Sequence, residues 1–382
     1  MQLFGFDLTE EEAMIAEAAR DAAARLLAPG AAARDKTGVF PVAEFNGLAQ
    51  LGFHAMKIAA HHGGIGASNI GYVLAMQALA EACASTAVVL ASCNMAAKIV
   101  GEHGTDAQRE RFLAPYARGE LGPISFALTE PSGGSDVLAM RTRAVRDGDD
   151  WVLTGEKAWI TGASHAGLHL VFARTGGEGK QGITCFLVER GSAGLTVGRD
   201  EDKMGQRSSG TATLSFDGCR VPGDRVVGAH GAGYALALSG LGAGRVGIAA
   251  LSLGIAEAAY ALGVAYAKER IVFGQPVSAF QNSQFVLADS RTELDAAWLL
   301  ALRAARALDG GARASGETSM AKLFATETCG RVVDRMVQLH GGYGYSREFA
   351  IERLYRDARV TRIYEGTSEI QRIVIAREIL GR

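Results

Sequence analysis

Apolar residues recur at helical spacing toward both ends of this 382-residue chain. Thr9-Glu-Glu-Glu12 has the spacing of a capping box ahead of an alanine-rich run, which we expect to end at Pro29-Gly30. The same pattern predicts further helices at about 42–51, 70–102 and 105–118. Long helical patterns return after Gly233 and predict helices at about 233–269, 281–308, 315–339, 347–358 and 368–380.

Between about Pro123 and residue 230 the chain breaks into short segments rich in β-branched and aromatic residues, separated by glycine-rich turns. Examples are Trp151-Val-Leu-Thr, Ala158-Trp-Ile-Thr, His169-Leu-Val-Phe, Ile183-Thr-Cys-Phe-Leu-Val and Thr211-Ala-Thr-Leu-Ser-Phe. This pattern of short segments and turns is typical of an antiparallel sheet. The sequence therefore predicts an α+β multidomain protein, with a helical N-terminal domain at 1–121, a central antiparallel β domain at 122–230 and a helical C-terminal domain at 231–382.

Composition narrows the classes of protein that fit. Apolar residues make up 48% of the chain, enough for a large core without disulfides. The net charge is −2 and the basic residues are spread along the chain, so nucleic acid is not expected as a partner. The five cysteines are widely spaced and odd in number, which indicates buried free thiols in a reducing compartment. The N-terminus lacks the features of a secretory signal, and the best apolar stretch, 71–100, is interrupted by polar residues. We therefore expect a cytoplasmic protein without a membrane span.

Two strings of residues stand out as candidate chemistry. Phe126-Ala-Leu-Thr-Glu-Pro-Ser-Gly-Gly-Ser-Asp136 joins an apolar segment to a glycine-rich turn, whose amides are suited to holding an anion. An ordinary polar turn is an equal alternative from these residues alone. The second string contains Glu365, just ahead of the last predicted helix. Ser368 and Gln371 have capping-box spacing, so we expect that helix to be capped without Glu365.

Other patterns are weaker. In a strand, Trp159 and Thr161 would share one face while Ile160 points away, although a tryptophan in the core is the favoured interpretation of this pattern by itself. The run from Gly242 to Gly247 satisfies G-x-G-x-x-G, but the segment before it is helix-prone, so we interpret it as part of a helix. His165 and His169 are four residues apart but lack a following acidic ligand, and His61 and His62 are adjacent in a loop, so no metal site is predicted.

Together the two strings resemble the acyl-CoA dehydrogenase family, and five motif regions follow that family's order along nearly the whole chain. The resemblance implies a four-helix C-terminal domain, tightly but noncovalently bound FAD and a homotetramer. It implies that Glu365 is the base that takes the α-proton of an acyl-CoA while the β-hydrogen leaves to the flavin. Some members carry this base just before the arginine that matches Arg245. Here that position is Gly244, which leaves Glu365 as the one matching base.

The resemblance also assigns binding residues. It implies that Arg270 and Gln281 reach the dinucleotide of a neighbouring subunit, and that Ser135, Arg245 and Gly366 contact substrate. The implied FAD-binding residues are Phe126, Leu128, Thr129, Gly134, Ser135, Trp159, Thr161, Arg270, Phe273, Gln281, Gln338, Gly341, Gly342, Thr367 and Glu369.

Substrate and electron acceptor are expected from the same resemblance. The strings at Gly244-Arg245, Ser319 to Thr326 and His340 to Tyr345 look like those of isobutyryl-CoA and short-chain members. We therefore expect a short or short-branched acyl-CoA in fatty acid or branched-chain amino acid catabolism, with electrons passing to electron-transferring flavoprotein. Two alternatives remain open: an acyl-CoA oxidase that uses oxygen, and a flavin- or acyl-CoA-binding protein without turnover.

Overall fold

The computed structural model of the chain describes residues 2–381. A short hairpin that the sequence pattern did not predict, β1 (Gln2–Leu3) and β2 (Phe6–Asp7), precedes α1 (Glu10–Ala22). The predicted capping box is confirmed, because Thr9 Oγ1 accepts from Glu12 N at 3.2 Å and Glu12 Oε2 accepts from Thr9 N at 2.9 Å. The predicted stop at Pro29 is wrong. Pro29 lies at the start of a 3-10 turn, where its missing N–H is not needed, and the chain runs on into α2 (Ala31–Thr37).

The remaining N-terminal helices are α3 (Val42–Gln50), α4 (Asn69–Ala82), α5 (Ala84–His103), α6 (Asp106–Gln108) and α7 (Ala114–Ala117). One helix was predicted over 70–102, whereas the structure has two. The break is at Cys83, whose backbone is extended (φ −156°, ψ 98°), and α4 and α5 meet there. Both helices are buried along most of their length, so tertiary packing rather than a local breaker residue decides where they separate.

The middle of the chain forms one sheet in the order β10-β7-β6-β4-β5-β9-β8, with β3 added beside β6. Its strands are β3 (Ile124–Ala127), β4 (Arg143–Asp147), β5 (Asp150–Ile160), β6 (Leu168–Arg174), β7 (Ile183–Glu189), β8 (Leu195–Asp200), β9 (Ala212–Val221) and β10 (Val226–Val227). The two segments expected at Trp151 and Ala158 are one strand, β5, with register shifts against β9. The pairing is antiparallel except that β3 and β4 each run parallel to β6.

The C-terminal part is helical, as predicted. It contains α8 (Gly233–Glu269), α9 (Gln281–Asp309), α10 (Ser315–His340), α11 (Ala350–Arg359) and α12 (Ser368–Ile379). A small hairpin, β11 (Ile271–Val272) and β12 (Gln275–Pro276), lies between α8 and α9. The G-x-G-x-x-G run lies inside α8, so the interpretation of it as helix is confirmed.

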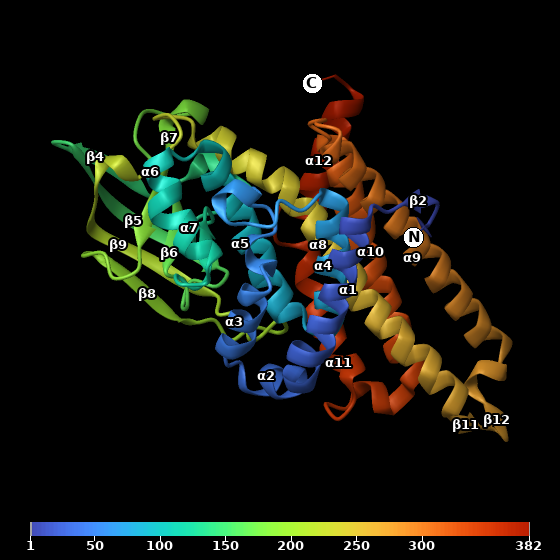
Figure 1. Cartoon of the computed structure of the whole chain (residues 1–382). Coiled ribbons are helices and arrows are strands. Elements are labelled where there is room, and N and C mark those ends of the chain that lie inside the picture. Colours follow the sequence, from blue (N-terminus) through green and yellow to red (C-terminus); the bar gives the residue numbers. More distant parts are fainter. Residues whose placement is uncertain (1, 382) are drawn as a thin grey trace.

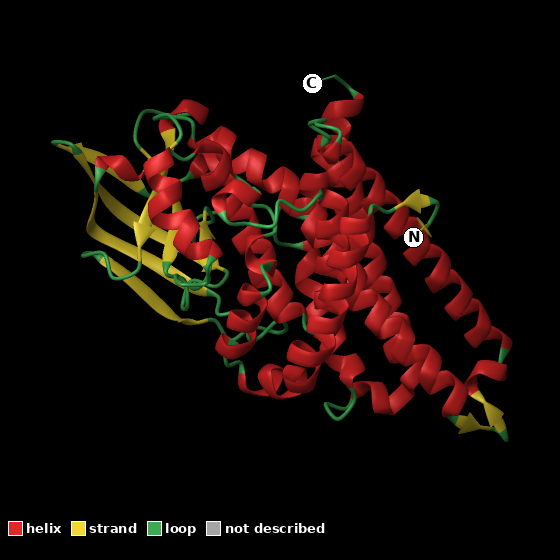
Figure 2. Cartoon of the chain, viewed as in Figure 1, coloured by secondary structure: helices red, strands yellow, loops and turns green. Residues whose placement is uncertain are grey.

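Three layers result (Figures 1 and 2). The sheet lies at one end, the bundle of α8, α9, α10 and α12 at the other, and the N-terminal helices between them. α5 contacts both β3 and α8, and α4 packs along α8. Helices α5 and α8 are long and apolar enough to cross a membrane, but 89% and 61% of their most apolar windows are buried within the protein. They serve here as core helices. All five cysteines are buried and free, as expected.

Candidate active site

Glu365 lies in the loop between α11 and α12, in an unusual backbone conformation. Its φ is +51° and that of Gly366 is +91°, and a positive φ is uncommon for a residue with a side chain. Thr367 caps α12, because its hydroxyl accepts from Ile370 N at 3.3 Å. The predicted cap by Ser368 is wrong: Ser368 is already inside the helix and its hydroxyl donates to Glu327 at 2.6 Å. The conclusion drawn from it stands, since α12 is capped without the Glu365 side chain.

The Glu365 carboxylate points inward and one oxygen, Oε2, is buried without a hydrogen-bond partner among residues 2–381. Helix α8 leaves room for it through a missing side chain. A Cβ built on Gly244 would lie 2.3 Å from Oε2 and 3.0 Å from Met95 Sδ. Burial raises the pKa of Glu365 to about 7, with the positive charges of Lys322 and Arg245 acting in the opposite direction. A carboxylate of this kind is matched to proton abstraction near neutral pH.

Arg245 follows Gly244 on α8 and is buried, with 8% of its surface exposed. Its Nη1 donates to Ser319 Oγ on α10 at 3.2 Å, and its Nε has no partner within the described chain. Burial lowers the pKa of Arg245, and the carboxylate of Glu365 raises it. The guanidinium therefore supplies positive charge beside the carboxylate.

Lys322 is a residue that sequence reasoning missed. It lies on α10, is fully buried, and donates from Nζ to the Gly366 carbonyl oxygen at 2.8 Å. Burial lowers its pKa to about 8, which Glu365 opposes. A signal was present in the sequence: Ser319, Lys322 and Thr326 recur at helical spacing on the buried face of α10, where a lysine is out of place.

The glycine-rich turn lies beside the end of β5. The Thr129 carbonyl accepts from Ala158 N at 3.0 Å, which joins the two predicted flavin motifs. Phe126 is in β3 against Phe172, with ring centroids 5.0 Å apart, and Leu128 is buried. Gly134 and Ser135 are exposed on the turn, so its backbone is open to a ligand.

A buried ion pair anchors this turn, and sequence reasoning also missed it. Lys157 Nζ lies 2.8 Å from Glu130 Oε1, with side chains 0% and 4% exposed. Glu130 also accepts from the amides of Arg141 and Thr142 at 2.6 Å and 2.9 Å. Both residues were within the motifs, but the charges are 27 residues apart in sequence and only the fold pairs them.

Trp159 and Ile160 face opposite ways, as expected, but β5 ends at Ile160, so Thr161 lies beyond the strand and does not continue the face of Trp159. The backbone of Trp159 is also irregular, with φ +60°. Trp159 is 61% exposed and Ile160 is buried, so the core interpretation of the tryptophan is wrong. Thr161 lies in the turn after the strand and is half-buried. An exposed indole beside the Thr129 turn is available to contact a ligand.

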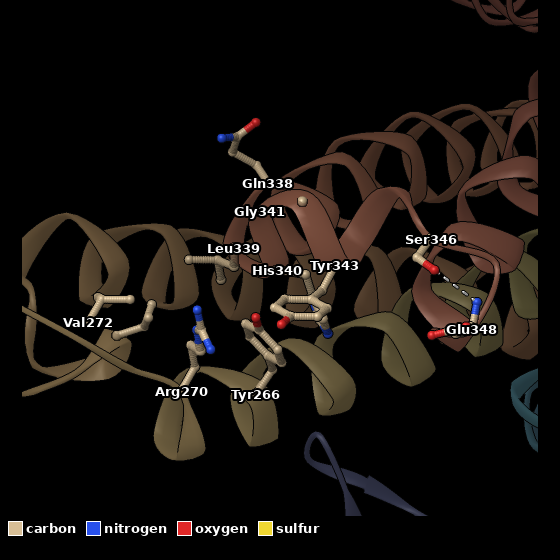
Figure 3. Close-up of a pocket in the computed structure, with 12 residues that line it drawn as sticks. Tyr266, Arg270, Val272, Gln338, Leu339, His340, Gly341, Tyr343, Ser346 and Glu348 are labelled. Carbon is tan, nitrogen blue, oxygen red and sulfur yellow. Dashed lines mark hydrogen bonds between the residues drawn. The ribbon is translucent and has the colours of Figure 1, made fainter.

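An open pocket of about 550 Å³ lies at the far end of α8 (Figure 3). Four of the residues that the resemblance assigns to FAD line this pocket together: Arg270, Gln338, Gly341 and Gly342. The Arg270 guanidinium lies 5.4 Å from the centroid of the Tyr343 ring. The Gln338 side chain is directed away from these two side chains (Figure 3). Phe273 and Gln281, two further residues that the resemblance assigns to FAD, do not line the pocket.

Those two residues, Phe273 and Gln281, project from the same end of the molecule. Phe273 lies at the tip of the β11–β12 hairpin, with φ +49°, and is 96% exposed. Gln281 is the first residue of α9 and is exposed. This end is far from the sheet (Figure 1), which carries Trp159 in β5 and is followed by Thr129 just after β3. Within one copy of the chain the two sets of predicted flavin residues therefore form separate surfaces.

Residues near Glu365 complete the predicted set. Gly366 and Thr367 form the loop and the helix cap described above. Glu369 is exposed in the first turn of α12, and hydrogen bonds from its own backbone amide and from Thr367 lower its pKa. Among residues 2–381 no cluster of three or more histidine, cysteine or acidic side chains is arranged to hold a metal ion.

Comparison with known proteins identifies the family. The acyl-CoA dehydrogenase N-terminal domain matches residues 9–120, the middle domain 125–219 and the C-terminal domain 231–380. The chain therefore belongs to the acyl-CoA dehydrogenase family and is an enzyme of that family. The predicted family, fold class and enzyme class are confirmed.

Individual relatives match over nearly their whole length. The mitochondrial short-chain specific acyl-CoA dehydrogenase of Mus musculus is 41% identical, over 98% of this chain and 91% of that protein. The solved butyryl-CoA dehydrogenase from Megasphaera elsdenii is 37% identical with a TM-score of 0.95, over 98% of this chain and 99% of that one. A chain from a solved structure described as the electron transferring flavoprotein of Acidaminococcus fermentans is 38% identical to this one. Its TM-score is 0.96, over 99% of this chain and 100% of that one.

Proposed function

We propose that this enzyme uses bound FAD to dehydrogenate a short or short-branched acyl-CoA between Cα and Cβ, and that its electrons pass to electron-transferring flavoprotein. Isobutyryl-CoA is the first substrate to test. Relatives named for short-chain acyl-CoA and butyryl-CoA support the substrate class. A similar chain comes from a solved structure described as an electron transferring flavoprotein, and this supports electron-transferring flavoprotein as the electron acceptor.

One observation carries the proposal: the buried, unpartnered Oε2 of Glu365. A buried polar atom without a partner is costly, and a substrate proton would satisfy it. In this proposal Glu365 Oε2 takes the α-proton of the thioester. The Glu365 N–H donates to no acceptor within the described residues, so it is free to bond the thioester oxygen as negative charge develops there. Arg245 and Lys322 favour the ionised carboxylate from which the reaction starts.

The residues present fit a flavin. The open turn at Gly134 and Ser135, the exposed Trp159 and the Arg270 pocket offer amides, an aromatic surface and a cation for a dinucleotide. Bound FAD would supply a two-electron acceptor for the β-hydrogen. Because the two surfaces lie far apart in one copy, we propose that FAD spans neighbouring copies in a homotetramer.

An anaerobic titration tests the function. Purified enzyme with FAD is mixed with isobutyryl-CoA, butyryl-CoA and a long-chain acyl-CoA, the flavin absorbance is followed, and oxygen is then admitted. Bleaching by the short thioesters that persists in air supports the proposal, and electron-transferring flavoprotein should then restore the colour. Rapid recovery with peroxide indicates an oxidase. No bleaching by any thioester indicates a binding protein, and preference for the long chain contradicts the substrate class.

A matched pair of variants tests the base. Glu365→Gln should abolish bleaching while FAD stays bound, because the amide keeps the shape but takes no proton. Glu378→Gln makes the same change at an exposed site near the end of α12 and should bleach like the wild type. Bleaching by Glu365→Gln at the wild-type rate would exclude Glu365 as the base.

A further inference from the structure

We propose that Lys322 is a positioning residue for the catalytic base: its ammonium group holds the Glu365 loop through the Gly366 carbonyl and keeps the carboxylate ionised. This inference rests on the proposed function, in which Glu365 is the base. It adds a second element, α10, to the control of that base.

The setting of Lys322 is unusual for a lysine. Its side chain is fully buried, yet it forms no direct ion pair with a carboxylate in residues 2–381, and its hydrogen bond goes to Gly366 O at 2.8 Å. A buried ammonium without a directly bonded carboxylate is costly to a fold. A hydrophobic side chain would fill the same space at lower cost, so the charge itself requires an explanation.

The hydrogen bond falls on the loop whose shape determines where the base lies. Glu365 has a positive φ, which the surrounding structure must hold in place. Two side chains clamp the next carbonyl: Lys322 Nζ and Gln371 Nε2 each lie 2.8 Å from Gly366 O. Gln371 Nε2 also lies 3.2 Å from Glu365 O. The loop is therefore held from α10 by a charged donor and from α12 by a neutral one.

The ionisable groups that act on Glu365 come from several elements. Lys322 on α10 and Arg245 on α8 are the positive groups that oppose its burial, and Lys322 is the larger influence. Tyr72 on α4 and Tyr364 in the loop stay neutral, because burial raises the pKa of each hydroxyl. Glu327 and Glu369 act on Lys322 and favour its charged form. Lys322 is thus the group whose loss should most alter the ionisation of the base.

Gln371 offers a matched control, because it holds the same carbonyl without a charge. Lys322→Met removes the hydrogen bond and the charge, whereas Gln371→Leu removes only hydrogen bonds. A purely structural role predicts that both variants slow the reaction without moving its pH dependence. The proposed role predicts that only the lysine variant moves it.

The test measures the rate of flavin bleaching by a saturating short acyl-CoA in stopped flow, from about pH 5.5 to about pH 9. We expect Lys322→Met to move the acidic limb to higher pH by about one unit or more, the effect of removing a nearby opposite charge. Gln371→Leu should lower the rate and leave the limb where the wild type has it. Lys322→Gln is a second uncharged variant in case Lys322→Met does not fold. An unmoved limb in the lysine variants, or an equal movement in Gln371→Leu, overturns the proposal.

A second readout needs no substrate. The difference in melting temperature between a protein and its Glu365→Gln counterpart follows the ionisation of that carboxyl as pH changes. In the Lys322→Met background this transition should lie at higher pH than in the wild type, and an unchanged transition overturns the inference. Failure of the wild type to bleach with any thioester would instead reject the proposed function. The two failures are therefore distinguishable.

Discussion

Replacing Glu365 with glutamine should stabilise the protein at alkaline pH, at the cost of its activity. The carboxyl has a pKa of about 7 in the folded protein against an ordinary value of 4.5, because it is buried. The folded state therefore holds the proton more tightly than the unfolded state. This contribution to stability is fully present below about pH 4.5 and is lost as pH rises through about pH 7. The glutamine side chain is neutral at every pH, so the Glu365→Gln variant does not lose this stability as pH rises.

The size of the effect follows from the shift. A difference of about 2.5 units corresponds to about 3 kcal/mol of unfolding free energy. Because Oε2 is shielded from water, solvent screening does not reduce this free energy. For a protein of this size we expect a rise in melting temperature of a few degrees at about pH 8.

Thermal unfolding of the FAD-bound protein without substrate provides the assay. Wild type, Glu365→Gln and Glu378→Gln are compared between about pH 5 and about pH 9. The advantage of Glu365→Gln should be smallest at the acidic end and grow to its plateau above about pH 8, while Glu378→Gln follows the wild type. A constant difference, or a wild type that gains relative to Glu365→Gln with rising pH, would refute a buried carboxyl of raised pKa.

Three further changes test other parts of the site. Gly244→Ala puts a Cβ where Glu365 Oε2 now lies, so stopped-flow bleaching should slow by about 10-fold to 100-fold with FAD retained, and an unchanged rate would show that the carboxylate does not need this space. Lys157→Met leaves Glu130 buried without its ion pair, so thermal unfolding should show a loss of about 3–5 kcal/mol and FAD should dissociate more readily; equal stability would contradict the pair's role. Phe273→Ala should preserve the fold but weaken the proposed assembly on size-exclusion chromatography, and an elution position equal to that of the wild type would contradict a contact of Phe273 between copies.

The long C-terminal helices were predictable because their pattern is local. Helices expected at 281–308 and 315–339 are observed at Gln281–Asp309 and Ser315–His340. The apolar residues that define such a helix recur every three or four positions, so a short stretch of sequence is enough to detect it. Errors arose where packing overrides local preference. Cys83 separates two helices without a breaker residue, and Pro29 is accommodated in a turn that continues the helical path. Trp159 takes a positive φ that strand alternation cannot anticipate.

The sequence by itself determined the family, the order of helical and β domains, and the identity of Glu365 as the candidate base, because motifs of consecutive residues carry that information. Only the tertiary structure decided the surroundings of the base. Lys322 reaches Gly366 from 44 residues away, and the missing side chain of Gly244 makes space for a carboxylate on another element. The ionisation of a buried group depends on charges and solvent exclusion through space, which the order of residues along the chain does not express.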